Sequence, residues 1–428
     1  MTRCHGMLAA IHSEQVCSAT ARAVGDFGSS HVTERLLGLP PPVGAKPAGS
    51  GRNGRALERV CCALPALIGM MLSAVAWAVD SGATGSTVPD GRAIFEARCA
   101  ACHGSDGKGA PGRAALKIAM PDFSDCSFAS REPDGDWRAV AHDGGPARGF
   151  SELMPAHGKL LSEAEIAAVV KHLRSFCSDR RWPRGELNLP RPLVTEKAFP
   201  EDEALITTFA NVNRDGEVAT DLLFEKRIGP RAMLEIALPV VAVEQRSATS
   251  SHWNAGVGDV GLGAKYAFFH SLESGSIASL GGELKIPTGD EDRGLGQGTV
   301  VFEPYLAAGQ RLPWNSFAQL QLLGEIPTER DMADEIQLRL ALGNAFSLRP
   351  HGRVLAPMVE MIGAWKLGDE SETDWDIVPQ IQVPLSRRQH IRVDLGVRIP
   401  LTNTDERATR FGAYLLWDWF DGGLLDGW

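Results

Sequence analysis

Apolar and polar residues alternate with a period of two over much of the chain after residue 203. The alternation is strict in Ile391–Ile399 and Ile336–Leu342, and shorter copies occur at Gln319–Leu322 and Glu283–Ile286. A period of two is typical of a β-strand with one apolar face. We count about twelve such segments, each about ten residues long, which is the length of a tilted strand that crosses a membrane.

The connections between these segments favour a membrane barrel over a soluble β-sandwich. Short links such as Arg227–Arg231 and Arg387–His390 alternate with longer ones such as Gln245–Gly258 and Gly289–Gly298. Outer-membrane barrels have short turns at the periplasmic end and long loops at the outer end. A sandwich also alternates, but it buries its apolar faces against each other and seldom needs so many strands in series. We therefore expect residues 203–428 to form an antiparallel β-barrel.

Two further features of this region bear on the barrel. An even number of strands would put both barrel ends on the short-turn, periplasmic side. The last segment, Arg410–Phe420, is aromatic-rich and resembles the terminal strand that outer-membrane assembly machinery recognises, although the tail Asp421–Trp428 follows it. Charged residues on the polar faces could line a pore or simply be solvated in a wet lumen; they are Glu283, Lys285, Arg339, Arg392, Asp394 and Arg398.

Between residues 88 and 180 the pattern is helical instead. Asp90–Arg98 is a short amphipathic stretch, and a second helix is expected after Ser162, with Glu163 and Glu165 in its first turn. Its apolar residues recur at helical spacing: Ile166, Val169, Val170, Leu173 and Phe176. We expect this face to pack on the first helix in a small all-α domain. The predicted fold class is thus a helical domain followed by a β-barrel.

The remaining segments carry no domain of their own. Residues 181–202 contain several prolines and scattered charge, which indicates an extended linker. Residues 1–57 have no periodic pattern, and we expect them to be disordered or upstream of the true start. Residues 58–78 end in Ala76-Trp77-Ala78, a small-x-small cleavage pattern, and are interpreted as a signal peptide. A transmembrane anchor is the alternative, although the run is near the lower limit for spanning.

The chemistry of the helical domain centres on Cys99-Ala100-Ala101-Cys102-His103, the C-x-x-C-H pattern of c-type haem attachment. Two thiols at this spacing can each add to a vinyl group of haem, and the histidine that follows can ligate the iron. C-x-x-C alone is also compatible with zinc or with a dithiol redox pair. The amphipathic lead-in and the glycine after the histidine favour haem.

A second axial ligand should come from a loop downstream of His103. Met154 lies well downstream and is followed by a proline, which stiffens the loop. Met120 is also followed by a proline but is much nearer to His103, and His142 and His157 are rival ligands. The alternative role of Met154 is a methionine of the core. Histidine in place of methionine would lower the reduction potential.

The cysteines and the net charge bear on the compartment and on the class of partner. Of the 8 cysteines, those before residue 63 fall in the segment expected to be removed. Cys126 and Cys177 remain beside the C-x-x-C-H pair, and an oxidising compartment would allow a disulfide between them. Two buried free thiols are the alternative. The net charge is −10 and no lysine–arginine cluster is present, so nucleic acid is not an expected partner.

Residues 88–180 resemble a class I cytochrome c domain, with C-x-x-C-H on the first helix and Met-Pro-Ala in the ligand loop. The resemblance implies one covalent haem c, with thioether bonds at Cys99 and Cys102 and with iron held by His103 and Met154. The Cys126 and Cys177 pair is not general in that family.

The barrel region also resembles a known group. Gly256–Tyr266 and Lys285–Gly289 are similar to segments of outer-membrane transporters of the phenol-degradation pathway type. The domain order resembles that of fused cytochrome–porins, with a fuller cytochrome domain and a smaller barrel. A barrel of about twelve strands is too narrow to enclose a cytochrome domain, so the haem is expected beneath it.

Three functions are compatible with this layout. A fused cytochrome–porin would move single electrons between a periplasmic redox protein and an extracellular donor or acceptor. Alternatively, the barrel takes up a small, aromatic compound, and the haem accepts electrons from a periplasmic dehydrogenase. In the third, the barrel only anchors a periplasmic electron carrier. No catalytic constellation is visible, so we expect an electron carrier of the outer membrane and no enzyme.

Overall fold

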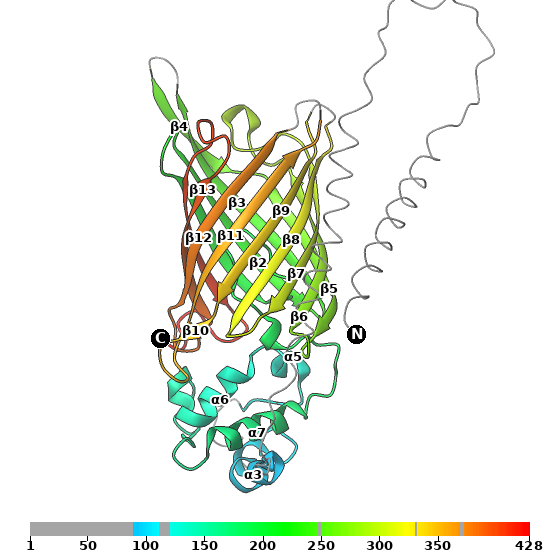
Figure 1. Cartoon of the computed structure of the whole chain (residues 1–428), viewed down its shortest axis with the longest axis vertical. Coiled ribbons are helices and arrows are strands. Elements are labelled where there is room, and N and C mark those ends of the chain that lie inside the picture. Colours follow the sequence, from blue (N-terminus) through cyan, green and yellow to red (C-terminus); the bar gives the residue numbers. More distant parts are fainter. Residues whose placement is uncertain (1–88, 111–119, 247–249, 330–331, 369–371) are drawn as a thin grey trace, which may run out of the picture. The chain divides into compact units, whose positions relative to one another are not determined.

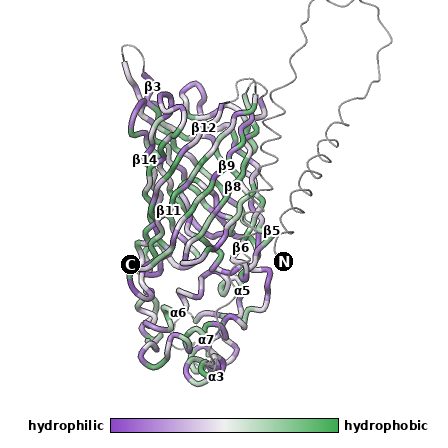
Figure 2. Tube along the Cα trace, in the orientation of Figure 1, coloured by the Kyte–Doolittle hydropathy of each residue, from purple (hydrophilic) through white to green (hydrophobic). Residues whose placement is uncertain are grey.

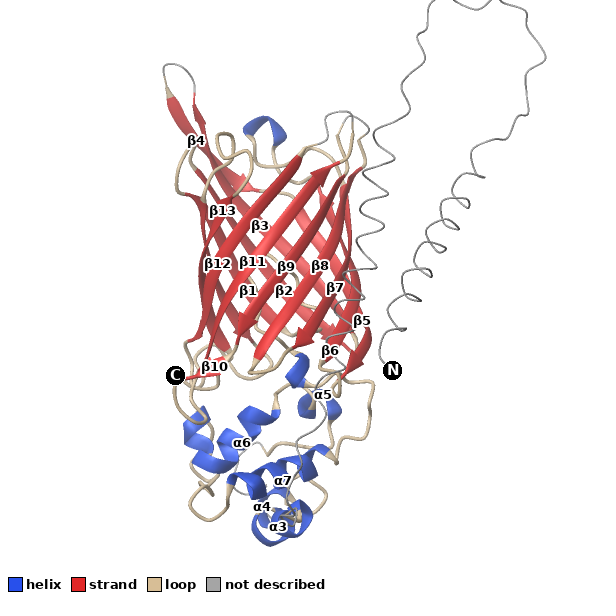
Figure 3. Cartoon of the chain, viewed as in Figure 1, coloured by secondary structure: helices blue, strands red, loops and turns tan. Residues whose placement is uncertain are grey.

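The computed structural model describes residues 89–428 except 111–119, 247–249, 330–331 and 369–371. Residues 1–57, expected to be disordered or upstream of the true start, and the predicted signal peptide at 58–78 lie outside the described residues. Figure 3 separates a helical part from an all-strand part in the remaining chain. The expected fold class, a helical domain followed by an antiparallel β-barrel, is therefore confirmed.

The helical domain consists of short helices (Figure 1). They are α3 (Gly91–Arg98), α4 (Ala100–His103), α5 (Cys126–Ala129), α6 (Asp134–Asp143), η3 (Gly145–Arg148) and α7 (Glu163–Arg174), with η4 (Gly185–Leu187) after them. No helix among the described residues is long and apolar enough to span a bilayer.

Helices α3 and α7 form the core of this domain. Helix α7 starts at a complete capping box, in which Ser162 and Glu165 satisfy each other's free backbone N–H groups. Of the expected apolar face, Ile166, Val169 and Val170 are buried and the rest is half-buried, and the Phe95 ring of α3 lies 5.7 Å from the Phe176 ring. A Cβ at Gly91 would overlap the Ala168 carbonyl of α7, so the two helices approach more closely than a side chain would allow.

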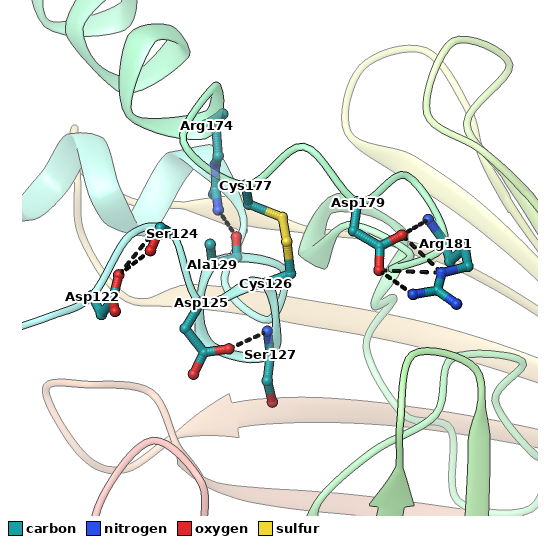
Figure 4. The surroundings of a disulfide bond; sticks show 10 residues. All are labelled: Asp122, Ser124, Asp125, Cys126, Ser127, Ala129, Arg174, Cys177, Asp179 and Arg181. Atoms are coloured by element: carbon teal, nitrogen blue, oxygen red, sulfur yellow. Dashed lines mark hydrogen bonds and ion pairs between the residues drawn. A yellow bond between two sulfur atoms is a disulfide. The ribbon is translucent and has the colours of Figure 1, made fainter. Parts of the chain in front are cut away.

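A disulfide joins the middle of this domain to its C-terminal end, as Figure 4 shows. Cys126 at the start of α5 is bonded to Cys177, which follows α7. The neighbouring Arg174 donates to the carbonyls of Ala129 and Glu132, which ties the end of α7 to the segment after α5. The disulfide expected from the sequence is thus confirmed, and the alternative of two free thiols is wrong.

Twelve antiparallel strands close into a barrel (Figure 1). They are β1 (Glu203–Asn211), β2 (Glu217–Ile228), β3 (Ala232–Arg246), β5 (Val260–Ser271), β6 (Ser276–Ile286), β7 (Val301–Arg311), β8 (Ser316–Pro327), β9 (Glu335–Asn344), β11 (Val354–Lys366), β12 (Thr373–Pro384), β13 (Ile391–Pro400) and β14 (Arg410–Asp418). Strand β14 pairs with β1, and Glu203 lies opposite Asp418. Both barrel ends therefore lie on the same side, as an even strand number requires.

Two short strands stand outside the barrel wall. Strand β4 (Ser251–Val257) pairs with the end of β3, so the expected long loop Gln245–Gly258 is largely a hairpin extension of the wall. Strand β10 (Phe346–Ser347) lies in the connection between β9 and β11 and pairs with β11. The expected loop Gly289–Gly298 contains a 3₁₀ turn, η5 (Glu291–Arg293).

The barrel has its apolar side chains outside and its polar side chains inside. On β3, Leu234, Ile236 and Leu238 are exposed, whereas Met233 and Glu235 are buried. The same alternation of polar and apolar residues runs along the other strands (Figure 2). This reverses the order in a water-soluble protein, where large exposed apolar surfaces are rare. A closed barrel with an apolar outer surface satisfies its backbone in lipid, so this barrel spans the outer membrane with its short turns in the periplasm.

The segment from residue 187 to residue 202, here called the lumen segment, lies inside the barrel. Its backbone bonds to inward side chains from strands around the wall, including Lys265 on β5, Gln321 on β8, Glu360 on β11 and Tyr414 on β14. Its apolar side chains are buried against three sets of inward residues. The region interpreted as an extended linker therefore also fills part of the barrel interior.

Candidate functional site

The C-x-x-C-H residues occupy one helical turn. Helix α3 ends at Arg98, and Cys99 caps the four-residue helix α4. The backbone N–H of His103 donates to the Cys99 carbonyl (N to O 3.0 Å), which fixes both on the same turn. Gly104 then turns the chain away with φ 75°, a conformation that favours glycine. The three groups needed for haem attachment and ligation thus project from a single rigid turn.

The His103 imidazole is half-buried and available as a ligand. Burial lowers its pKa, and the nearby His157 adds to this, so the ring is held in the neutral form that binds metals. The buried Nδ1 of this ring has no hydrogen-bond partner among the described residues. The Phe123 ring, 5.3 Å from the imidazole between centroids, packs beside it.

The two thiols do not fit the alternatives to haem. Cys99 and Cys102 are free rather than bonded to each other. Burial raises the pKa of the Cys99 thiol, whereas a reactive dithiol pair needs a lowered pKa. Within the described ranges, neither cysteine belongs to a cluster of three or more metal-ligating side chains, as a structural zinc site would require.

The loop that carries Met154 is shaped by glycines. The Gly145 N–H donates to the Met154 carbonyl (N to O 2.9 Å), and a Cβ at Gly145 would lie 3.1 Å from the Met154 Cβ. Gly144 has φ 85°, a conformation that glycine adopts at low cost and other residues rarely adopt. This packing holds the Met154 backbone against the end of α6.

The rival ligands differ in their surroundings. The His142 Nδ1 lies 2.6 Å from the Asp143 carboxylate, and its Nε2 faces Glu163. Met120 packs beside Gly109, whose N–H donates to the His103 carbonyl. The His157 Nδ1 is buried with no partner among the described residues. Met154 stays the predicted second ligand on its loop pattern alone, and His157 is the residue to test against it.

The described residues fit a covalent haem c. The thiols of Cys99 and Cys102 would hold it, with His103 and Met154 as the iron ligands. The group supplies one-electron transfer between ferric and ferrous iron. The chain's own contribution is the Phe123 ring, which packs beside the His103 imidazole and limits the access of water on that side.

Two family models match the chain. Residues 88–176 match the family described as Cytochrome c. The chain carries a cytochrome c domain and an outer-membrane β-barrel. The second match covers residues 199–347 and is to the family described as "Putative MetA-pathway of phenol degradation". The cytochrome c match implies a covalent haem c with iron in the helical domain. The two matches together confirm the resemblances to a cytochrome c domain and to transporters of the phenol-degradation pathway type.

Solved structures similar to this chain resemble its barrel. An outer membrane channel from Pseudomonas putida F1 is 14% identical, with a match over 54% of this chain and 99% of that chain and a TM-score of 0.40. The KdgM porin is 12% identical over 50% of this chain and 98% of its own, with a TM-score of 0.31. Outer membrane phospholipase A from Escherichia coli is 10% identical over 51% and 97%, with a TM-score of 0.32. The comparison with curated proteins found no match.

The interior of the barrel holds a buried charged cluster that the sequence analysis did not predict. Arg191 of the lumen segment pairs with Glu203 (2.6 Å) and Glu225 (2.9 Å), and Lys197 pairs with Glu201 (2.7 Å). All of these side chains are buried. The only sequence signal was a run of charges among prolines, which also fits a solvated linker.

The six charged residues expected to face the lumen do point inward. Glu283 and Arg339 line a small interior cavity of about 110 Å³ next to the lumen segment. Arg398 lines a larger cavity of about 610 Å³ at the long-loop end. Lys285 pairs with Glu303 on the neighbouring strand, and Asp394 is fully buried. The larger cavity holds as many carboxylates as arginines, so it has no strong preference for one sign of charge.

Proposed function

We propose that the protein is a monohaem electron carrier of the outer membrane, a fused cytochrome–porin that links the periplasm to the cell exterior. The observation that carries the proposal is the single turn bearing Cys99, Cys102 and the neutral His103, on a chain that also closes into a membrane barrel. His103 and Met154 would be the two iron ligands of a bound haem, which would supply one-electron transfer and leave no open position for a substrate.

The contacts of the cytochrome domain support a fixed position at the periplasmic end of the barrel. Arg388, in the turn between β12 and β13, donates to the Gly149 carbonyl of the domain (2.9 Å). Gln389 of the same turn donates to Asp136 (3.1 Å), and Arg131 pairs with the buried Asp202. A haem held in this way meets a periplasmic redox protein or dehydrogenase as its partner.

The lumen segment supports electron transfer over solute flow. It continues the chain from the disulfide at Cys177 into the barrel and occupies the periplasmic part of the lumen. A filled lumen obstructs a solute, and this favours electron carriage by the haem domain over solute uptake. An extracellular donor or acceptor would complete the path.

The experiment uses intact cells that express the protein with its haem reduced. A membrane-impermeant oxidant is added outside, and the haem absorbance is followed. Oxidation at a rate well above that of cells with a periplasmic cytochrome as control supports the link to the exterior. If the haem is oxidised only after the outer membrane is permeabilised, the exterior link is wrong and the protein is a periplasm-facing carrier.

A second candidate is an uptake channel for a small, aromatic compound, with the haem accepting electrons from a dehydrogenase that oxidises it. The cavity of about 610 Å³ at the long-loop end favours it, because it offers a compound a polar entrance lined by Arg214, Arg407 and Arg410. This candidate requires the lumen segment to move. Uptake of labelled benzoate or phenol by proteoliposomes, compared with empty liposomes, separates the two functions.

A further inference from the structure

Three metal-ligating side chains converge where the cytochrome domain meets a periplasmic turn of the barrel. His142 lies in the last turn of α6, Glu163 is the first residue of α7, and His351 lies in the connection between β10 and β11. The Glu163 Oε1 is 3.1 Å from the His351 Nε2 and 3.6 Å from the His142 Nε2. One ligand atom from each residue lies within 4.8 Å of the other two.

The His142 ring is already oriented as a metal ligand. Its Nδ1 lies 2.6 Å from the Asp143 Oδ1, so a proton on Nδ1 is held by that carboxylate and the lone pair of Nε2 faces Glu163 and His351. A carboxylate behind the non-ligating nitrogen is the usual second partner of a metal-bound histidine. A Cβ at Gly158 would overlap the same ring, so the backbone there also fixes its position.

The other two ligands are free of competing tasks. In the capping box of α7 it is Glu165, and not Glu163, that bonds back to Ser162. His351 has φ 54°, a left-handed conformation that is uncommon outside glycine and that directs its ring toward the cytochrome domain. Its side chain is only 14% exposed, although it lies in a turn. Such a strained position is a recurrent feature of functional residues.

The separations match those of a tetrahedral metal site. Zinc binds histidine nitrogen and carboxylate oxygen at about 2.0–2.1 Å, which places two tetrahedral ligands about 3.3 Å apart. The two printed separations, 3.1 and 3.6 Å, bracket that value. We propose that His142, Glu163 and His351 bind a divalent zinc-class ion, with Asp143 orienting His142 and with water as the fourth ligand.

This site goes beyond electron transfer, because it would clamp the cytochrome domain to the barrel. Two ligands come from the helical domain and one from a barrel turn, so the ion can be held only when the two are docked. The nitrogen-rich ligand set selects zinc-class ions over Mg²⁺ and Ca²⁺, which prefer all-oxygen sites.

The test is calorimetric titration of Zn²⁺ into the tag-free, haem-loaded full chain in detergent. We expect one high-affinity site, and no comparable binding of Mg²⁺. The variant Glu163→Gln keeps the length of the side chain but removes its charge. The variant His351→Asn removes the imidazole, and asparagine tolerates the left-handed backbone conformation at this position. Both should abolish the high-affinity site, and Asp143→Asn should weaken it by about 10–100-fold.

His252→Asn is the matched control, since His252 is exposed on β4 at the opposite end of the barrel. Hydrogen exchange supplies a second readout: Zn²⁺ should slow exchange in both the β10–β11 connection and the start of α7 in the wild type and in His252→Asn. Haem content reports whether each variant folds. No Zn²⁺ binding by the wild type, or binding that survives both Glu163→Gln and His351→Asn, would overturn the proposal.

Discussion

The backbone N–H of Thr195 donates to the Glu360 carboxylate, with the nitrogen 2.6 Å from Oε2, although the residues are 165 positions apart. Both are buried. The same carboxylate accepts the N–H of Val194 (3.1 Å) and the side-chain amide of Gln380 (2.6 Å). One glutamate of β11 thus fixes the centre of the lumen segment.

Replacing this glutamate should loosen the lumen segment. In Glu360→Ala, the N–H groups of Val194 and Thr195 and the amide of Gln380 lose their acceptor, and each unpaired buried group costs about 1–3 kcal/mol. We expect low conductance for the wild type in planar bilayers and a several-fold rise in open-channel conductance for Glu360→Ala.

The control for this measurement is Glu273→Ala, because Glu273 is exposed in the turn between β5 and β6 and faces no lumen residue. Its conductance should equal that of the wild type. A wild type with a large, steady conductance would contradict a filled lumen, and an unchanged Glu360→Ala would show that other contacts hold the segment.

Met154 is the residue whose change should alter the haem most selectively. Replacing the thioether by imidazole in Met154→His should lower the reduction potential within the range of about 0.8 V that axial ligands span. Redox titration followed by absorbance measures the shift, with Met120→Leu as the matched control. If His157→Leu lowers or abolishes the low-spin spectrum while Met154→Leu leaves it unchanged, the ligand is His157 instead.

The disulfide should stabilise the cytochrome domain. Cys126 and Cys177 are separated by 51 positions, and closing a loop of that length is worth about 4 kcal/mol in the chain-entropy model. Urea unfolding of the domain, followed by haem absorbance, should show a lower midpoint for the double variant Cys126→Ala/Cys177→Ala. A reductant should lower the midpoint of the wild type and leave that of the double variant unchanged. Equal midpoints without reductant would show that the bond contributes little.

The stability of the cytochrome domain should also depend on pH through Asp136. Burial raises the pKa of its carboxyl to about 7, and the charge of Glu132 adds to the rise, while Arg148 and Arg392 oppose it. Because the folded state then holds a proton that the unfolded state releases, stability is greatest below the ordinary pKa of 3.8 and is lost as pH rises toward 7.

The variant Asp136→Asn removes this titration. The wild-type domain should unfold at lower urea concentration at about pH 8 than at about pH 5, and Asp136→Asn should show a smaller difference. Gln389 and Arg148, which donate to the Asp136 Oδ1, can still donate to an asparagine oxygen, so the contacts remain comparable. A pH dependence that is the same in both proteins would assign it to other groups.

The parts of the molecule that are local in sequence could be predicted. The haem turn needs only five consecutive residues, and the start of α7 needs only Ser162 and Glu165, so both are visible without tertiary information. The period of two told which side chain of each strand faces out, because a strand in a closed barrel has only two faces. That is why Glu283 and Arg339 could be assigned to the polar, inner face.

The parts that depend on contacts between residues far apart in the sequence could not be predicted. The lumen segment has no helical or strand period, and its proline-rich sequence is equally typical of a solvated linker, since its partners such as Glu360 and Gln380 lie on strands far along the chain. The cluster at His142 was likewise hidden, because His351 joins it from a barrel turn. The choice of Met154 rests on the loop pattern and stays a prediction.

The most direct test of the central claim, that one chain carries both a covalent haem and an outer-membrane barrel, is a haem-stained gel of outer-membrane fractions run with and without boiling. We predict a haem-positive band in the outer membrane whose mobility shifts on boiling, because the barrel stays folded in detergent until heated. A haem-positive band that is found only in the soluble periplasm and does not shift would contradict the account.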